Sequence, residues 1–404
     1  MANLDLMRRL HEPNDTKMIL LIMDGLGGLS QDGGTGPTEL EAANTPTMDR
    51  LAAEGALGQI IPVRRGVTPG SGPAHLGLFG YDPVEFDVGR GVLEAAGIGM
   101  QVQPGDVAAR GNFCTVDDDG KITDRRAGRI ATEEAKPLVE KLKSIELPGV
   151  ETEVEVLREY RFGLVLRGQN LAPNIADTDP LEVGEAPLAA KPLDDASQHT
   201  AELIDNWADQ ARQILSDQPK ANALTLRGFS TNPQLPQFPE IYGLNPACIA
   251  VYPMYRGVSS LVGMKVLQFQ GEDPTDEFTT LNERWDDHDY FFVHIKKTDS
   301  LGEDGAFDKK AAYIEKVDQA LHMVLDLEPD VLAITGDHST PSRMRYHSWH
   351  PVPLLLWAPA TIRHDTQDSF GERHCAAGGL GTFPSYELMP LMMAHARRFK
   401  KYGA

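Results

Sequence analysis

Four continuous runs of apolar residues stand out along the chain, and each has the length of one buried strand. They are MILLIM at residues 18–23, YFFVHI at 290–295, DVLAIT at 330–335 and VPLLLW at 352–357. None alternates regularly between apolar and polar positions, which is typical of strands that are covered on both faces. The pattern therefore predicts a mostly parallel sheet with helices on both faces.

Helical periodicity lies between these runs. From residue 307 to 326 apolar side chains recur at helical spacing, including Ile314, Val317 and Leu321. Another helix is predicted from Thr45-Pro46 to Ala53, because threonine is a good N-cap and proline suits a first turn. Strands that alternate with helices predict an α/β fold.

The middle of the chain has a different pattern. Between residues 110 and 268 the apolar runs are short, for example 162–166 and 223–226, and proline- and aspartate-rich loops separate them. We interpret residues 109–271 as an inserted, smaller α+β domain. Residues 1–108 and 272–404 would then form one discontinuous domain.

Composition narrows the class of protein. Hydrophobic residues make up 41% and charged residues 24% of 404 residues, as in an ordinary globular chain. The formal net charge of -21 disfavours nucleic acid and anionic membranes as partners. The three cysteines are far apart without CxxC spacing, and no early apolar run has the length of a signal or a membrane span. We therefore expect a cytoplasmic protein.

One serine lies in an unusual setting. Ser71 is flanked by glycines in the segment TPGSGPAH, and glycines allow a sharp turn that exposes the side chain. A serine hydroxyl becomes a useful nucleophile when a base or a metal ion favours its alkoxide. Ser71 is therefore a candidate nucleophile, and a plain glycine-rich turn is the alternative.

Aspartate and histidine residues follow the predicted strands. They are Asp24, Asp299, Asp337, His338 and His347. Carboxylates and imidazoles are ligands for divalent cations such as Mn²⁺, and this number of ligands suits two ions. Any one of them alone would more often be a helix cap or an ordinary histidine, so the hypothesis depends on their joint occurrence.

Arginines gather in the predicted insertion. They are Arg110, Arg125, Arg129 and Arg227. Guanidinium groups bind phosphate and carboxylate bidentately, so these residues are candidates for an anionic substrate. A solvated surface cluster is the alternative.

The chain also carries motifs in an order that is typical of one known family. They are Met23-Asp24-Gly25, Asn44-Thr45-Pro46, Gly70-Ser71-Gly72-Pro73-Ala74-His75, Phe79-Gly80-Tyr81-Asp82-Pro83, Asp124-Arg125-Arg126-Ala127-Gly128-Arg129, Asp177-Thr178-Asp179-Pro180, Lys297-Thr298-Asp299, Gly336-Asp337-His338-Ser339-Thr340-Pro341 and His347-Ser348-Trp349-His350-Pro351-Val352-Pro353. With these motifs the chain resembles the alkaline phosphatase superfamily and, within it, the archaeal-type cofactor-independent phosphoglycerate mutases.

The resemblance implies a role for each matched residue. Ser71 would be phosphorylated and would share one metal with Asp24, Asp337 and His338, while Asp299 and His347 would hold the other. The arginines and Asp124 would bind the substrate. The family usually has a histidine four residues after the Asp of Lys-Thr-Asp, and here that position is Glu303, which we expect to replace it as a carboxylate ligand.

The implied activity is that of an isomerase in glycolysis and gluconeogenesis. It would interconvert 3-phosphoglycerate and 2-phosphoglycerate with two divalent ions, Mn²⁺ first and Mg²⁺ or Zn²⁺ as alternatives, without 2,3-bisphosphoglycerate. The partner would be a small phosphorylated carboxylic acid, and a homo-oligomer stays open. The rival hypotheses are a homoserine kinase-like phosphotransferase, a metal-dependent phosphatase or phosphonate hydrolase, and a binding protein that lost catalysis through Glu303. The roles of His75 and His350 stay undecided.

Overall fold

The computed structural model describes residues 3–403, and its largest feature is an eight-stranded sheet. The strand order is β13 (Gly381–Pro384), β2 (Ala56–Ile61), β12 (Val352–Trp357), β11 (Val331–Thr335), β1 (Met18–Met23), β10 (Tyr290–Ile295), β8 (Pro246–Ala250) and β9 (Lys265–Val266). Only β12 runs antiparallel to its neighbours, which are β11 and β2. The predicted mostly parallel sheet of an α/β fold is confirmed.

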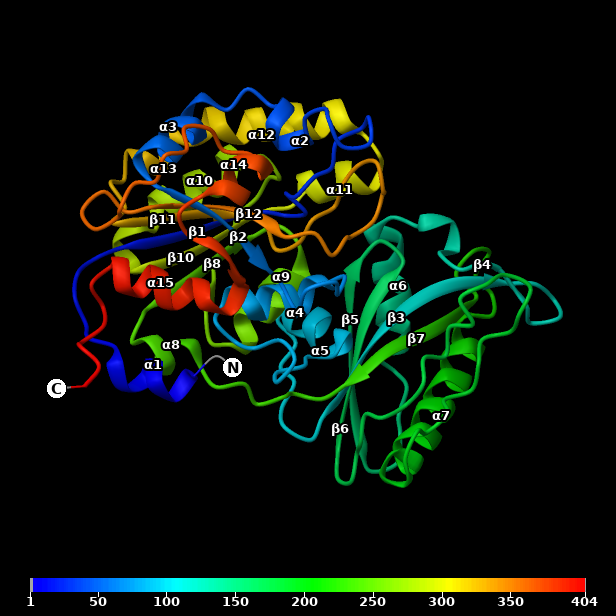
Figure 1. Ribbon diagram of the computed structural model, residues 1–404. Helices are drawn as coiled ribbons and strands as arrows, with labels where there is room; N and C mark the ends of the chain where they lie inside the picture. The colour runs from blue at the N-terminus through cyan, green and yellow to red at the C-terminus, as the bar shows by residue number, and fades with distance from the viewer. Residues whose placement is uncertain (1–2, 404) are drawn as a thin grey trace. The chain divides into compact units, whose positions relative to one another are not determined.

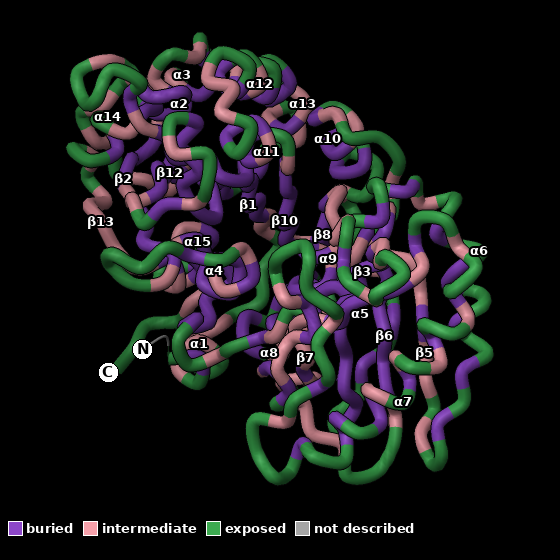
Figure 2. The backbone as a smooth tube through the Cα atoms, turned by 90° about the vertical axis from the view of Figure 1, so that its right-hand side faces the viewer, coloured by how far each residue is buried: buried purple, intermediate pink, exposed green. Residues whose placement is uncertain are grey.

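Helices cover both faces of this sheet (Figure 1). On one face lie α2 (Glu39–Ala42), α3 (Pro46–Glu54), α10 (Pro274–Glu283), α11 (Lys297–Glu303), α12 (Phe307–Ala320), α13 (His322–Leu325) and α14 (Glu372–Ala377). On the other lie α4 (Ser71–Leu78), α8 (Phe238–Tyr242), α9 (Pro253–Leu261) and α15 (Leu388–His395), with α1 (Leu4–Leu10) beside α8. All six residues of β1 are fully buried, as Figure 2 shows for the central strands. Burial on both faces explains why the run is continuously apolar.

The predicted helix over 307–326 is interrupted. The chain forms α12 and α13, with Leu321 between them, and both pack on the same side. Ile314, Val317 and Leu321 all lie in the core cluster, so the amphipathic pattern identified the buried face correctly.

A second sheet is antiparallel. Its strands are β3 (Val107–Val116), β4 (Ile122–Asp124), β5 (Val150–Arg158), β6 (Arg161–Gly168) and β7 (Ala223–Ser230). Helices α6 (Thr132–Leu142) and α7 (Gln198–Leu215) enclose a core around Phe113, Phe162 and Trp207. Helix α5 (Arg90–Gly97) packs on β3 and β7.

The chain divides into two compact units, and their boundaries differ from the predicted ones. The first unit comprises the residues up to Asp87 and from Leu235 onward, and the second is Val88–Gln234. Strand β8 pairs in parallel with β10, so the segment that contains it belongs to the large sheet rather than to the insertion. Helix α5 packs on the second sheet and therefore leaves the first unit. The predicted boundaries at 108/109 and 271/272 are thus displaced, because short apolar runs do not reveal which sheet they join.

Among the described residues, no helix combines the length and the apolar character that crossing a membrane requires.

Candidate metal centre and active site

Three parallel strands end side by side in the large sheet. Met23 of β1 is in register with Ile295 of β10, and Ile22 is in register with Thr335 of β11. The residues that follow these strands therefore emerge at one edge, which is where open α/β sheets bind ligands. The predicted ligands Asp24, Asp299, Asp337 and His338 all come from these strand ends or the turn of helix that follows.

Asp24 is completely buried directly after β1. Its Oδ2 accepts hydrogen bonds from the Lys296 ammonium at 2.9 Å and from the Tyr255 hydroxyl. Burial alone would raise the pKa of this carboxyl, but the charge of Lys296 lowers it well below its ordinary value. Asp24 therefore stays ionised, and its Oδ1 has no hydrogen-bond partner among the described residues.

Asp337 and His338 follow β11 and are equally buried. The Gly25 amide donates to Asp337 Oδ1 at 3.1 Å, whereas Oδ2 has no hydrogen-bond partner within residues 3–403. His338 Nε2 lies 3.2 Å from that Oδ2 and 3.4 Å from Asp24 Oδ1. Burial lowers the pKa of His338 well below its ordinary value, so the imidazole is neutral.

Asp299 and His347 form the adjoining part of the cluster. Asp299 Oδ2 accepts from Lys296 at 2.6 Å, and its Oδ1 accepts from the Thr340 hydroxyl at 2.7 Å. His347 Nε2 lies 3.8 Å from Asp299 Oδ1, and the His347 ring stacks on that of His338 with centroids 3.6 Å apart. Asp299 lies on α11, and His347 lies in the loop before β12.

The donor atoms form groups that fit divalent cations. Asp24, Asp337 and His338 make one group, and Asp299, His338 and His347 make another, with all donor atoms of a group within 4.8 Å of one another. Buried atoms without partners, such as His338 Nε2 and Asp337 Oδ2, are costly unless something compensates them. Carboxylate oxygen and neutral imidazole nitrogen are suitable ligands for ions such as Mn²⁺ or Zn²⁺, so the donor set fits a metal.

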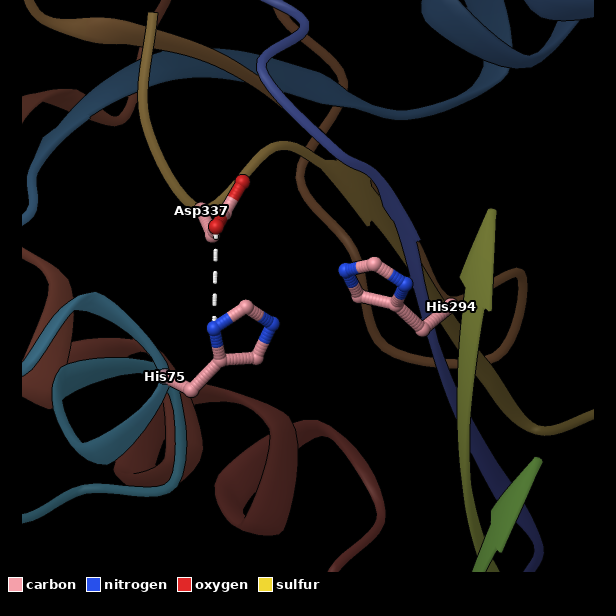
Figure 3. A group of neighbouring side chains, drawn as sticks. All are labelled: His75, His294 and Asp337. Atoms are coloured by element: carbon pink, nitrogen blue, oxygen red, sulfur yellow. Dashed lines mark ion pairs between the residues drawn. The ribbon is translucent and has the colours of Figure 1, made fainter. Parts of the chain in front are cut away.

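A further group of donors, His75, His294 and Asp337, shares Asp337 with this cluster. Figure 3 shows His75, His294 and Asp337 as neighbours, with His75 Nδ1 3.6 Å from Asp337 Oδ2. Burial lowers the pKa of His75 to about 4 and that of His294 well below its ordinary value. Both rings are therefore neutral, and no described residue forms a hydrogen bond with the Nε2 atom of either ring.

Ser71 is the first residue of α4, and two histidines connect its segment to the cluster. His75, one turn later, approaches the Ser71 carbonyl oxygen with Nδ1 at 2.7 Å. His347 Nδ1 lies 2.9 Å from the carbonyl oxygen of Pro69. The Ser71 side chain therefore lies at a helix N-terminus, where backbone N–H groups favour an anion.

Glu303 ends α11 and is exposed, unlike the other predicted ligands. Loss of hydration and the charge of Asp299 raise the pKa of its carboxyl. It belongs to none of the donor groups among the described residues. Its side chain would have to turn inward to bind an ion.

Three residues of the centre were not predicted from the sequence. Lys296, rather than the Lys297 of the motif, contacts both Asp24 and Asp299, and two adjacent lysines in sequence do not reveal which one faces inward. Tyr255 comes from α9 and carried no local signal. His294 was detectable, because it is the only histidine in an otherwise apolar strand. His350, left undecided, approaches the Ser348 hydroxyl oxygen with Nδ1 at 3.0 Å.

The predicted arginines lie in the second unit, and three of them meet. Strand pairing sets Arg110 opposite Arg227. Arg125 donates two hydrogen bonds to Asp179, at 3.1 and 2.8 Å, and Arg227 NH1 lies 3.5 Å from the same carboxylate. Arg110 is 6% exposed with its Nε unpartnered, and burial lowers its pKa to about 10. This is a half-buried group of cations, partly neutralised by Asp177, Asp179 and Glu94.

The other two predicted substrate residues behave differently. Asp124 accepts hydrogen bonds from the backbone amides of Arg126 and Gly128, at 2.8 and 2.7 Å, and so closes the turn after β4. Arg129 is exposed, and its side chain forms no ion pair with another residue of the described range 3–403. Any ligand contact of Asp124 would be additional to its role in the turn.

Comparison with known proteins places these features in a family. The model of 2,3-bisphosphoglycerate-independent phosphoglycerate mutases matches residues 52–221. A Thermus thermophilus protein described as a probable enzyme of this name is 50% identical over 98% of both chains. An Aquifex aeolicus protein of the same description is 48% identical over 99% of this chain and 100% of its own.

Solved structures support the same family. A protein of Pyrococcus horikoshii matches with a TM-score of 0.83 and 31% identity, over 97% of this chain and 100% of its own. A cofactor-independent phosphoglycerate mutase from Thermoplasma acidophilum matches with a TM-score of 0.72 and 30% identity, over 94% and 100%. The chain therefore belongs to the 2,3-bisphosphoglycerate-independent phosphoglycerate mutases, which are isomerases.

Proposed function

We propose that this protein interconverts 3-phosphoglycerate and 2-phosphoglycerate, a step of glycolysis and gluconeogenesis, through transient phosphorylation of Ser71. The observation that carries the proposal is the convergence of buried, unpartnered carboxylate and imidazole atoms beside the helix that Ser71 begins. The names of the homologous proteins support the choice of substrate.

Two divalent cations are part of the proposal. Asp24, Asp337, His338 and Ser71 would hold one, and Asp299, His347 and Glu303 would hold the other. When bound, such cations would favour the Ser71 alkoxide and neutralise charge on the transferred group. We favour Mn²⁺, with Mg²⁺ or Zn²⁺ as alternatives.

A third cation is not assigned to His75, His294 and Asp337. Four carboxylates and one ammonium make up the charged groups of the proposed centre: Asp24, Asp299, Asp337, Glu303 and Lys296. Two divalent cations already exceed their net negative charge, and a third beside them would be repelled. The neutral histidines of Figure 3 are therefore better suited to line the wall of the centre.

The chain's own groups perform the rest of the reaction. The Ser71 Oγ attacks phosphorus, the bond to the 3-oxygen of the substrate breaks, and the proton of the serine ends on that oxygen. The 2-hydroxyl of the retained glycerate then takes the phosphoryl group back, and the proton returns to Ser71. Backbone N–H groups at the start of α4 would stabilise the charge that develops on the phosphoryl oxygens.

Glycerate must stay bound between the two steps. Arg110, Arg125, Arg129 and Arg227, with Asp124, are the residues that we assign to its carboxylate and hydroxyl groups and to the incoming phosphate. Arginine suits this role because its planar fork holds carboxylate and phosphate in a fixed orientation. No bisphosphorylated cofactor is required, because each phosphoryl group leaves from and returns to the same glycerate.

The compartment is part of the proposal too. The three cysteines, Cys114, Cys248 and Cys375, are free and buried. Free thiols suit a reducing compartment, so we assign the protein to the cytoplasm.

The first test is the coupled assay. Mn²⁺-loaded protein should form 2-phosphoglycerate from 3-phosphoglycerate without 2,3-bisphosphoglycerate, detected with enolase. Ser71→Ala should lose at least about 10⁴-fold in kcat, because a covalent step cannot be replaced by binding alone. Ser260→Ala, an exposed serine on α9, is the matched control and should keep full activity.

Other outcomes would select the rival functions. Release of inorganic phosphate without 2-phosphoglycerate would indicate a phosphatase or phosphonate hydrolase, and ATP-dependent phosphohomoserine would indicate a homoserine kinase. Protein that holds far fewer than two ions and never forms phosphoserine at Ser71 would indicate a binding protein.

A further inference from the structure

Thr340 lies between two side chains that the proposed function assigns to different cations. Its Oγ1 is 2.7 Å from Asp299 Oδ1 and 3.0 Å from His338 Nδ1. Thr340 and His338 are fully buried and Asp299 is 2% exposed, so water does not compete for these contacts. The Thr340 hydroxyl is therefore held between Asp299 and His338, away from solvent.

The number of protons decides the direction of both hydrogen bonds. An ionised carboxylate only accepts, so the single hydroxyl proton of Thr340 goes to Asp299. The same oxygen must then accept from His338, which requires the proton of the neutral imidazole to be on Nδ1. The lone pair of His338 is thereby left on Nε2.

That lone pair faces two carboxylates. His338 Nε2 lies 3.4 Å from Asp24 Oδ1 and 3.2 Å from Asp337 Oδ2, and all three atoms lack a hydrogen-bond partner in the part of the chain that the structure describes. A nitrogen lone pair and carboxylate oxygens repel one another unless a proton or a cation lies between them. The orientation that Thr340 imposes is therefore the one a metal ligand needs.

The backbone of Thr340 is held as firmly as its hydroxyl. Its amide donates to the carbonyls of Gly25 and Gly27, at 3.2 and 3.0 Å. Its own carbonyl accepts from the buried ammonium of Lys310 at 2.9 Å, and Lys310 also donates to the Gly25 carbonyl at 2.7 Å. The loop after β1, which follows Asp24, and the loop after β11, which carries His338, thus meet at Thr340.

We propose that Thr340 is a positioning residue that fixes the Nδ1–H tautomer of His338 and couples the two cation positions through its bond to Asp299. The inference rests on the proposed metal assignment. It gives the threonine hydroxyl a role beyond folding, since the hydroxyl determines which nitrogen is free to bind the ion.

The test is a comparison of variants by Mn²⁺ titration calorimetry. Thr340→Val keeps the shape and removes the hydroxyl, and it should weaken Mn²⁺ binding by about 10–100-fold, the usual effect of losing a group that orients a ligand. Thr340→Ser keeps the hydroxyl and should bind close to wild type. Thr335→Val is the matched control, because Thr335 is also buried and donates to the Pro353 carbonyl at 2.6 Å outside the cluster.

A second measurement reads the tautomer of His338 directly in the wild-type protein. Nitrogen-15 NMR of histidine-labelled, Mg²⁺-loaded protein should show His338 protonated at Nδ1, with its signal identified by loss in His338→Asn. In Thr340→Val the same signal should shift or split between tautomers. A proton on Nε2 of His338 in the wild type would overturn the inference.

The two proposals fail separately. Wild-type protein that binds fewer than two ions would contradict the metal assignment itself. Wild type and Thr340→Val with equal Mn²⁺ affinity, when wild type binds two ions, would overturn only the role of Thr340.

Discussion

At the scale of single residues, three histidine side chains of the centre share one arrangement. His75 and His347 have Nδ1 close to the carbonyls of Ser71 and Pro69, and His338 has Nδ1 close to the Thr340 hydroxyl. In each case a local acceptor occupies Nδ1 and leaves Nε2 free. The ligand geometry is therefore present before any ion binds, which reduces the cost of ordering these side chains on binding.

Glu277 is a buried residue of another kind. It lies on α10 with 1% exposure, and neither carboxylate oxygen has a hydrogen-bond partner among residues 3–403. Burial, with the nearby charges of Asp276 and Asp273, raises its pKa well above the ordinary 4.5. The folded protein therefore prefers the protonated form.

We predict a pH-dependent cost from Glu277. Below about pH 4.5 the Glu277 carboxyl is protonated in both the folded and the unfolded chain, so its ionisation does not change the free energy of unfolding. As the pH rises toward the raised pKa of the folded state, Glu277 ionises in the unfolded chain but not in the folded one. The free energy of unfolding therefore falls by about 1.4 kcal/mol for each pH unit. Glu277→Gln should remove this slope and melt a few degrees higher than wild type at pH 8, measured by thermal unfolding between pH 5 and 9.

The control for this prediction is Glu283→Gln, an exposed residue at the end of the same helix, whose melting profile should follow that of wild type. Parallel profiles for Glu277→Gln and wild type would contradict the assignment of a protonated Glu277.

At the scale of elements, the centre depends on two strand-to-loop junctions that touch. The loop after β1 bridges to Ser339 through Leu26 and Gly27. A Cβ on Gly27 would lie 1.9 Å from Ser339 Oγ and 2.7 Å from Ser339 Cβ, so only glycine allows this approach. Asp24 and His338 are close because these loops are close.

We predict that Gly27→Ala pushes the two loops apart. Overpacking of this kind costs about 1–3 kcal/mol, and displaced ligands should lower Mn²⁺ affinity by at least about tenfold. Thermal unfolding and Mn²⁺ titration would measure the two effects. The double variant Gly27→Ala/Ser339→Gly removes the clashing side chain and should recover part of both losses. Unchanged Mn²⁺ affinity in Gly27→Ala would show that the close approach of the loops is not needed for binding.

At the scale of the whole molecule, the proposed ligands come from elements far apart in sequence. Asp24 follows β1, Asp299 lies on α11 after β10, and Asp337 follows β11. A bound cation would connect these elements in the folded state alone. Binding is therefore coupled to the stability of the first unit.

We predict that metal removal lowers the melting temperature. Mn²⁺ at one hundred times its dissociation constant should add about 2.7 kcal/mol for each site, which corresponds to about 5 °C or more. Chelation should reverse this gain, and Asp337→Asn should show little of it. Hydrogen exchange should slow at the ends of β1, β10 and β11 and stay unchanged in β3 and β6 of the second unit. Equal protection of both units would contradict a metal centre confined to the first.

Much of this arrangement could be predicted from the sequence. The apolar runs predicted β1, β10, β11 and β12, and the polar residues after them predicted the candidate centre. Such features are local, because a strand buried on both faces must be apolar throughout and its polar end must lie at the sheet edge. The family resemblance rested partly on the same segments and partly on motifs elsewhere in the chain, such as Gly70-Ser71-Gly72 and Asp124-Arg125-Arg126.

Tertiary structure alone decided the remainder. Whether β8 joins the large sheet depends on a partner strand more than forty residues away, so the boundaries of the units could not be placed from local pattern. The choice of Lys296 over Lys297, the approach of Tyr255 and the hydroxyl of Thr340 between two ligands depend on distances between segments that composition does not encode. Sequence periodicity reports which side of an element is buried, whereas proton positions and side-chain contacts follow only once the elements have packed.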